Sequence, residues 1–179
     1  MPDFSADRRK AELVPHDPAW ASQASIESAR LAAAIGDTLI GIEHVGSTSI
    51  PGIVAKPTID LMPVVRDLAT LDTRQPQVEA LGYLWRGEWG FAGRRYCVRD
   101  KNGKRLFHVH CYETGHPEIA RTLAFRDYLR SHPEEARAYE AAKRTAAAAH
   151  PDDMLAYNAH KGTWMKGAIE RALAWAAAR

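Results

Sequence analysis

The chain has 179 residues, 46% of them hydrophobic and 26% charged, and its formal net charge is +2. These values are ordinary for one well-cored globular domain, and the charge is too small to indicate nucleic-acid binding by itself. Cys97 and Cys111 have no CxxC spacing, no apolar run approaches the roughly 18 residues of a membrane span, and no signal-peptide core follows the start, so we expect a cytoplasmic protein. We expect a flexible polar tail over residues 1–10 and one domain over residues 11–179.

The first predicted element is a helix that begins near Pro18, with Asp17 as its cap, and ends at Gly36. Residues 38–46 are rich in β-branched side chains and end in glycine, which predicts a strand. Residues 47–55 predict a loop or one short helical turn.

Residues 56–65 predict a second strand, which we expect to be central because it is almost continuously apolar. Pro63 within it indicates a bulge or a sheet edge. Residues 67–82 predict a helix interrupted near Pro76.

Two further strands, at residues 94–100 and 105–113, are joined by an Asn-Gly hairpin signal. From about residue 116 onward the pattern is helical, and prolines precede or open the successive helices. The predicted fold class is therefore α/β (α+β), with a small mixed β-sheet flanked by helices and a helical C-terminal third.

The junction between the first two strands suggests a binding site. Gly46 lets the backbone turn closely around a ligand, and the amides from Ser47 to Ser49 can hold phosphate oxygens. Asp60 on the next strand can hold a divalent cation, and Lys56, four residues earlier, would share its face. The simpler interpretation is a pair of ordinary turns, but an unpaired carboxylate within an apolar run is costly.

The strand at residues 105–113 alternates cleanly, so His108 and His110 share one face, opposite the face that enters the core. Together with Asp60 they would form a site of two histidines and one carboxylate, which suits zinc, manganese, iron or nickel better than magnesium. The alternative is two half-buried histidines that are hydrogen-bonded to neighbours.

The remaining charged positions are less specific. We interpret most of the arginines at 94, 95 and 99 as solvated charges of an edge strand, and Arg126 with Asp127 as a structural ion pair. Lys161 lies on a helical stripe, from which it either extends into the cleft or snorkels out of a buried face. The tryptophans are expected in the core or the wall of the cleft, and no aromatic-basic interleaving indicates nucleic-acid binding.

The stretch "EHVGSTSIPGIVAKPTIDL" resembles the signature of the GrpB family, bacterial proteins with a nucleotidyltransferase-like fold of the DNA polymerase β type. The stretches "LVPHDPAW", "FHVHCYE", "FRDYLRSHPEEARAYEAAKR" and "YNAHKGTWMKGAIERA" resemble further family motifs, in family order over almost the whole chain. The resemblance implies the fold, and because such domains also occur fused to dephospho-CoA kinase, it points toward coenzyme A or nucleotide metabolism. Active nucleotidyltransferases usually carry a second acid two residues after the first, where this chain has Met62.

Two function classes follow, and the sequence leaves both open. One is an enzyme that transfers a nucleotidyl or phosphoryl group with a divalent metal, either Mg²⁺ or Mn²⁺ or a transition metal such as Zn²⁺. The other is a non-catalytic module that binds a phosphate-containing small molecule, such as a nucleotide or a coenzyme A-like compound. A third hypothesis is a metal-dependent hydrolase that uses His108 and His110. The candidate residues are, for catalysis, Asp60, Lys56 and His110; for phosphate or ligand binding, Gly46, Ser47, Thr48, Ser49, Lys56 and Lys161; and for metal binding, Asp60, His108 and His110.

Overall fold

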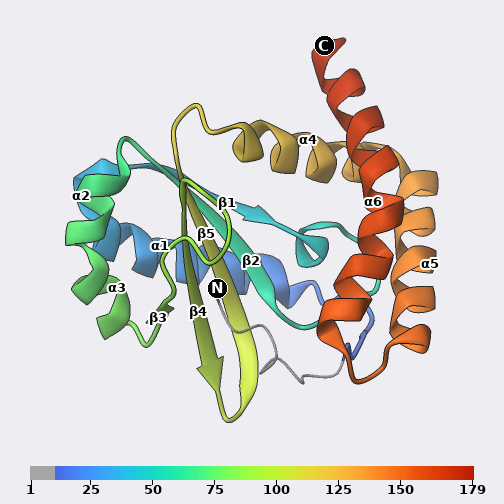
Figure 1. The fold of residues 1–179 in the computed structure, drawn as a ribbon, viewed down its shortest axis with the longest axis horizontal. Coiled ribbons are helices and arrows are strands. Elements are labelled where there is room, and N and C mark those ends of the chain that lie inside the picture. The colour runs from blue at the N-terminus through green and yellow to red at the C-terminus, as the bar shows by residue number, and fades with distance from the viewer. Residues whose placement is uncertain (1–10) are drawn as a thin grey trace.

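A mixed five-stranded sheet forms the centre of the molecule, in the order β1-β2-β5-β4-β3 (Figure 1). This computed structural model describes residues 11–179, so the predicted tail at residues 1–10 lies outside the described residues. The strands are β1 (Leu39–Val45), β2 (Ile59–Val65), β3 (Leu84–Trp85), β4 (Arg94–Lys101) and β5 (Lys104–Glu113). Strand β2 runs antiparallel to β1 and parallel to β5, and β4 runs antiparallel to both β5 and β3.

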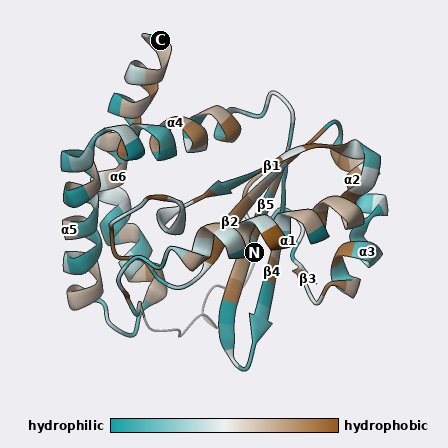
Figure 2. Cartoon of the chain, turned by 180° about the vertical axis from the view of Figure 1, so that it is seen from behind, coloured by the Kyte–Doolittle hydropathy of each residue, from teal (hydrophilic) through white to brown (hydrophobic). Residues whose placement is uncertain are grey.

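Helices cover this sheet on one face and stand beside it on the other (Figure 1). The helices are α1 (Ala19–Ile35), α2 (Leu68–Thr73), α3 (Gln75–Ala80), α4 (Pro117–Ser131), α5 (Pro133–Ala149) and α6 (Met154–Ala177), with short 3₁₀ turns at Gly36–Thr38 and Ser47–Ser49. Helix α1 lies against the back of the sheet, where Figure 2 shows it crossing the strands. Within residues 11–179, no helix combines the length and the apolar character that crossing a membrane requires.

The main hydrophobic core lies between α1 and the sheet. It contains Leu31 and Ile35 from the helix and Leu61 and Val109 from the central strands, all almost completely buried. Because side chains alternate along a strand, the neighbours of Val109 on β5 must point to the opposite face of the sheet. That second face carries the polar residues of β5 and is the one from which a site can be built.

The predicted fold class is confirmed. The small mixed sheet, the flanking helices and the helical C-terminal third are all present, and Gly46-Ser47 follows one strand beside an acid on the next, as in a nucleotidyltransferase-like fold. The Asn-Gly hairpin is also present, and Asn102 and Gly103 have φ angles of 52° and 74°, as a two-residue primed turn requires.

Two expectations about β2 are wrong. Pro63 marks no edge, because β2 lies between β1 and β5, and the irregularity lies on the other side: the β1–β2 register shifts between Leu39 and Gly41, opposite Val65 and Val64, whereas the pairing with β5 keeps one register. The pairing with β5 simply has no ladder partner at Pro63, so the missing N–H is accommodated without a shift. Lys56 also lies before the strand, which begins at Ile59, so its position relative to Asp60 is not set by strand alternation.

Candidate functional site

A cleft of about 730 Å³ opens between the second face of the sheet and helices α5 and α6. Its lining includes six cationic side chains but only two carboxylates, which makes it a cationic cavity that suits an anionic ligand. The cations are Lys56, Arg94, Lys104, Arg105, Lys143 and Lys161, and the carboxylates are Glu12 and Asp60.

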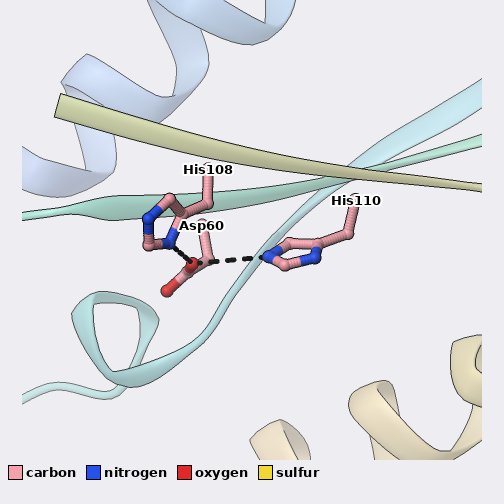
Figure 3. A group of neighbouring side chains, drawn as sticks. All are labelled: Asp60, His108 and His110. Carbon is pink, nitrogen blue, oxygen red and sulfur yellow. Dashed lines mark hydrogen bonds and ion pairs between the residues drawn. The ribbon is translucent and has the colours of Figure 1, made fainter. Parts of the chain in front are cut away.

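Asp60, His108 and His110 converge on one point of this cleft (Figure 3). Asp60 Oδ1 lies 3.0 Å from His108 Nδ1 and 3.7 Å from His110 Nε2. One potential ligand atom from each residue lies within 4.8 Å of the other two. The parallel pairing of Asp60 with His108 creates this arrangement, and strand alternation adds His110 on the same face. The structure therefore brings together all three predicted metal ligands.

The protonation states in this cluster suit a cation. Burial by itself would raise the pKa of the Asp60 carboxyl, but the hydrogen bonds from His108 and His110 outweigh it and hold that pKa far below its ordinary value. Burial also lowers the pKa of His108, and its Nε2 is buried without a hydrogen-bond partner among residues 11–179. An ionised carboxylate beside a neutral imidazole is the form in which these groups bind a metal ion, so the donor set fits a transition metal.

Gly46 is needed where it stands because Asp60 passes directly beside it. A Cβ atom on Gly46 would lie 2.2 Å from Asp60 Oδ2, and the residue has φ 71° and ψ −174°, a conformation that is essentially restricted to glycine. The glycine therefore makes room for the carboxylate at the strand end.

The three residues that follow Gly46 do not all face the cleft. Ser47 lines it, and its hydroxyl donates to the Tyr139 hydroxyl over 3.2 Å. Thr48 and Ser49 are buried: Thr48 shares a 2.9 Å hydrogen bond with His44, and Ser49 directs both its hydroxyl and its amide to the Gly46 carbonyl. A phosphate-binding role of this segment stays a prediction, with Ser47 as the member in reach.

The position of the usual second acid is apolar. Met62 is buried together with Val45 and Tyr112, and residues of α4 pack over it. Two carboxylates on the strands of the site form bonds elsewhere: Glu43 of β1 accepts from Arg126, and Glu113 of β5 accepts from the amide of Leu68. Among residues 11–179, no second cluster of acidic, histidine or cysteine side chains has metal-ligand spacing.

Three lysines line the cleft near its helical wall: Lys143 on α5, Lys161 on α6, and Lys56 in the segment before β2. Lys56 and Lys161 lie over the ring of Tyr157, with their ammonium groups 5.5 Å and 5.1 Å from its centre. Lys143 is 1% exposed, and its ammonium group donates to the carbonyl of Val54. Burial lowers the pKa of Lys143 to about 7, with a further contribution from Lys161, and burial also lowers the pKa of Lys161.

Lys143 was missed by the sequence analysis, although a signal for it exists. The buried residues of α5 are Ala136, Tyr139, Lys143 and Ala146, which follow helical spacing. A lysine on such a buried stripe is unusual and identifies a candidate for a functional role.

The interpretation of the β4 arginines as solvated edge charges is wrong. Strand β4 is covered by β3, and Arg94 is only 6% exposed. Its guanidinium donates to the carbonyl oxygens of Trp89 and Glu88, over 2.9 Å and 3.2 Å. Arg95 and Arg99 lie on the opposite face of the strand, where they form ion pairs with Asp72 and Glu27, respectively. The predicted ion pair between Arg126 and Asp127 is confirmed, at 2.7 Å.

Comparisons with known proteins agree with this architecture. The family model described as GrpB protein matches residues 10–171. A crystal structure of the conserved protein GrpB from Enterococcus faecalis has a TM-score of 0.85 and 37% identity to this chain, and the match covers 90% of this chain and 97% of that one.

Curated relatives extend the comparison to longer proteins. UPF0157 protein YqkA of Bacillus subtilis is 44% identical over 168 residues, which cover 94% of this chain and 49% of the relative. A dephospho-CoA kinase of Mycolicibacterium paratuberculosis is 32% identical over 196 residues, which cover 94% of this chain and 47% of the kinase. The chain thus spans about half the length of these two relatives.

Proposed function

Because the chain belongs to the GrpB family, we propose that this nucleotidyltransferase-like domain binds a phosphate-containing small molecule together with one divalent metal ion. The observation that carries the proposal is the convergence of Asp60, His108 and His110 in a cleft that six cationic side chains also line. A nucleotide or a coenzyme A-like compound has the required phosphates. Similarity to a dephospho-CoA kinase supports the coenzyme A-like candidate.

The donor set favours Mn²⁺ or Zn²⁺ over Mg²⁺, because imidazole nitrogen suits transition metals and Mg²⁺ prefers oxygen ligands. A divalent ion held by Asp60, His108 and His110 would supply Lewis-acid polarisation of a phosphate oxygen. Ser47 and Lys56 line the same cleft and are available to the other phosphate oxygens. The negative charge of the ligand would therefore be compensated by the metal ion and by the Lys56 ammonium group.

Catalysis is the second candidate function. Nucleotidyl transfer by two metal ions requires several carboxylates, whereas Met62 occupies the position of the second acid. The three convergent donors favour chemistry with one metal ion, namely hydrolysis or transfer of a phosphoryl group. In that case Asp60 and His110 hold the ion, and Lys56 balances negative charge that develops on the phosphate.

The test is metal binding by the variant Asp60→Asn, measured by native mass spectrometry and calorimetry with Mn²⁺ and Zn²⁺. We expect about one ion per chain for the wild type and none for the variant. The variant should fold and melt only slightly below the wild type, because asparagine keeps the shape of the side chain but loses the charge that His108 and His110 stabilise. His110→Ala should also abolish binding.

His160→Ala is the control, because His160 is exposed and does not line the cleft. Metal retained in stoichiometric amounts by the double variant His108→Ala, His110→Ala would contradict the proposed site. A large fall in melting temperature of Asp60→Asn with intact metal binding would identify Asp60 as a structural carboxylate.

A further inference from the structure

Lys143 and Lys161 form one end of the cleft, which we call the lysine end. Among residues 11–179, no carboxylate lies within ion-pair distance of either ammonium group. Lys143 is almost fully buried and Lys161 is partly buried. Asp60 and Glu140 act on these lysines only from beyond ion-pair distance, and the Lys143 ammonium donates to the Val54 carbonyl, so neither lysine has a direct ion-pair partner within the described part of the chain.

Such an arrangement is unfavourable unless an anion enters it. Removing an ammonium group from water costs several kcal/mol, and a second cation nearby adds repulsion. The lowered pKa of Lys143 has these two causes, burial first and Lys161 second. A pyrophosphate group carries enough negative charge to compensate both lysines at once, and its two phosphorus centres spread that charge over more oxygen atoms than a single phosphate group offers.

The opposite end of the cleft, which we call the ring end, is formed by the loop between β3 and β4. Phe91 in this loop is 54% exposed, although it lines the cleft. The Arg94 guanidinium lies 4.4 Å from the centre of the Phe91 ring and 4.7 Å from that of Tyr96. Trp89 lines the same end and has φ 46°, which is rare for a bulky residue and is found mainly at functional sites.

The ring end offers flat surfaces to a planar group. Aromatic side chains and guanidinium groups at the rim of a site stack on nucleobases, and such stacking tolerates any base. Arg94 is buried and held in place by the carbonyl oxygens of Glu88 and Trp89, so it supports the Phe91 ring from the protein side and leaves the outer face of that ring to a ligand. An exposed phenylalanine beside it would lose contact with water when a ring covers it.

The two ends lie on either side of the metal-binding cluster. Helices α5 and α6 stand beside the sheet on one side, and β4 lies on the other (Figure 1). Strand β4 is separated from β2 by β5, which places it on the order of 10 Å from Asp60 at the usual spacing of strands. The Arg94 side chain bridges this spacing, since its guanidinium lies 3.5 Å from His110 Nδ1, so the ring end adjoins the metal-binding cluster.

We infer that the cleft recognises a nucleoside diphosphate group, with its pyrophosphate at Lys143 and Lys161 and its base stacked on the exposed ring of Phe91. The group is either a free nucleotide or part of a coenzyme A-like molecule, since both contain it. This inference rests on the proposed function, which requires only that the ligand carries phosphate.

The test is calorimetry on the full chain with ADP, coenzyme A, pyrophosphate and adenosine at one fixed concentration of Mn²⁺. We expect ADP to bind at least tenfold more tightly than pyrophosphate or adenosine. Phe91→Ala should weaken ADP binding by roughly 5- to 150-fold, the range for loss of one stacked base, and leave pyrophosphate binding unchanged. Lys143→Met and Lys161→Met should each weaken the binding of both ADP and pyrophosphate by about tenfold or more. Lys166→Met, an exposed lysine on the same helix as Lys161, is the matched control and should change neither.

The outcomes separate this inference from the proposed function. Equal affinity for ADP and pyrophosphate, unaffected by Phe91→Ala, would overturn the ring end and leave the proposed function intact. ADP affinity unaffected by both lysine substitutions would overturn the lysine end. Failure of the wild type to bind any of the phosphate compounds would overturn the proposed function itself. Tighter binding of coenzyme A than of ADP would support the inference with a coenzyme A-like molecule as the ligand. Tighter binding of ADP would support it with a free nucleotide as the ligand.

Discussion

Two groups of buried charge lie on opposite sides of the sheet, and they differ in how the charge is compensated. On the side of α1, the carboxylate of Glu27 is 3% exposed and is met by Arg99 at 2.8 Å, Arg30 at 3.0 Å and the hydroxyl of Tyr83 at 2.9 Å. On the cleft side, Lys143 and Lys161 have no carboxylate among the described residues within ion-pair distance. A fully paired buried charge is typical of a structural network, whereas buried charge of one sign in a cleft indicates a place for a ligand.

The largest expected effect tests the structural side. Arg99→Met should lower the free energy of unfolding by about 3 kcal/mol, because it leaves Glu27 buried with fewer compensating groups. The value lies at the low end for a broken buried pair since Arg30 and Tyr83 remain. Chemical denaturation measures it, and ADP affinity should be unchanged. Arg30→Met is the control, with an expected loss below about 1 kcal/mol, because the Arg30 side chain is 45% exposed. Equal losses for the two variants would show that burial does not distinguish these ion pairs.

A smaller effect on stability, accompanied by loss of metal binding, is expected at Gly46, which follows β1. Gly46→Ala should lower the free energy of unfolding by about 2 kcal/mol from backbone strain and displace Asp60, so that metal binding is lost. Gly52→Ala is the matched control: its φ is 80°, but no atom lies within 4 Å of the added Cβ. That variant should show a loss of about 1 kcal/mol and keep the metal. Denaturation and metal titration on the same samples check both, and normal metal binding by Gly46→Ala would contradict the close approach.

The effect that is smallest for each step of the measurement, at most about 1.4 kcal/mol per pH unit, is a dependence of stability on pH. In the folded protein burial lowers the pKa of Lys143 from 10.5 to about 7, so folding disfavours its charged form. Below pH 7 this penalty is fully present. Between pH 7 and 10.5 the unfolded chain binds more protons, and stability therefore rises with pH.

This contribution is isolated by subtraction. The free energy of unfolding of the wild type minus that of Lys143→Met should increase from pH 7 to pH 10, by at most about 1.4 kcal/mol per pH unit. Nearby charged groups, namely Glu140, Arg144 and Lys161, are common to both proteins and cancel in the difference. A difference that stays flat over this range would show that Lys143 is solvated and would weaken the lysine end.

Much of the site could be predicted where local rules apply. The alternation of β5 correctly assigns Val109 to the core and His108 with His110 to the other face, because strand periodicity does not depend on the rest of the fold. The hairpin at Asn102-Gly103 follows in the same way from local backbone preference. By contrast, local rules left a bulge or an edge open at Pro63, because the missing ladder partner that tolerates a proline in a central strand depends on the register with β5.

What the sequence by itself determined is therefore the fold class and the facing of individual strands, which local periodicity, turn residues and the family motifs specify. Only the tertiary structure decided which charges share a space. The pairing of β2 with β5 places Asp60 beside His108, and the packing of α5 and α6 beside the sheet brings Lys143 and Lys161 to the same cleft from far along the chain. Electrostatic interactions depend on distance and burial rather than on separation in sequence, so a lysine that is ordinary on a helical surface becomes a candidate for ligand binding only when the fold buries it in a cleft.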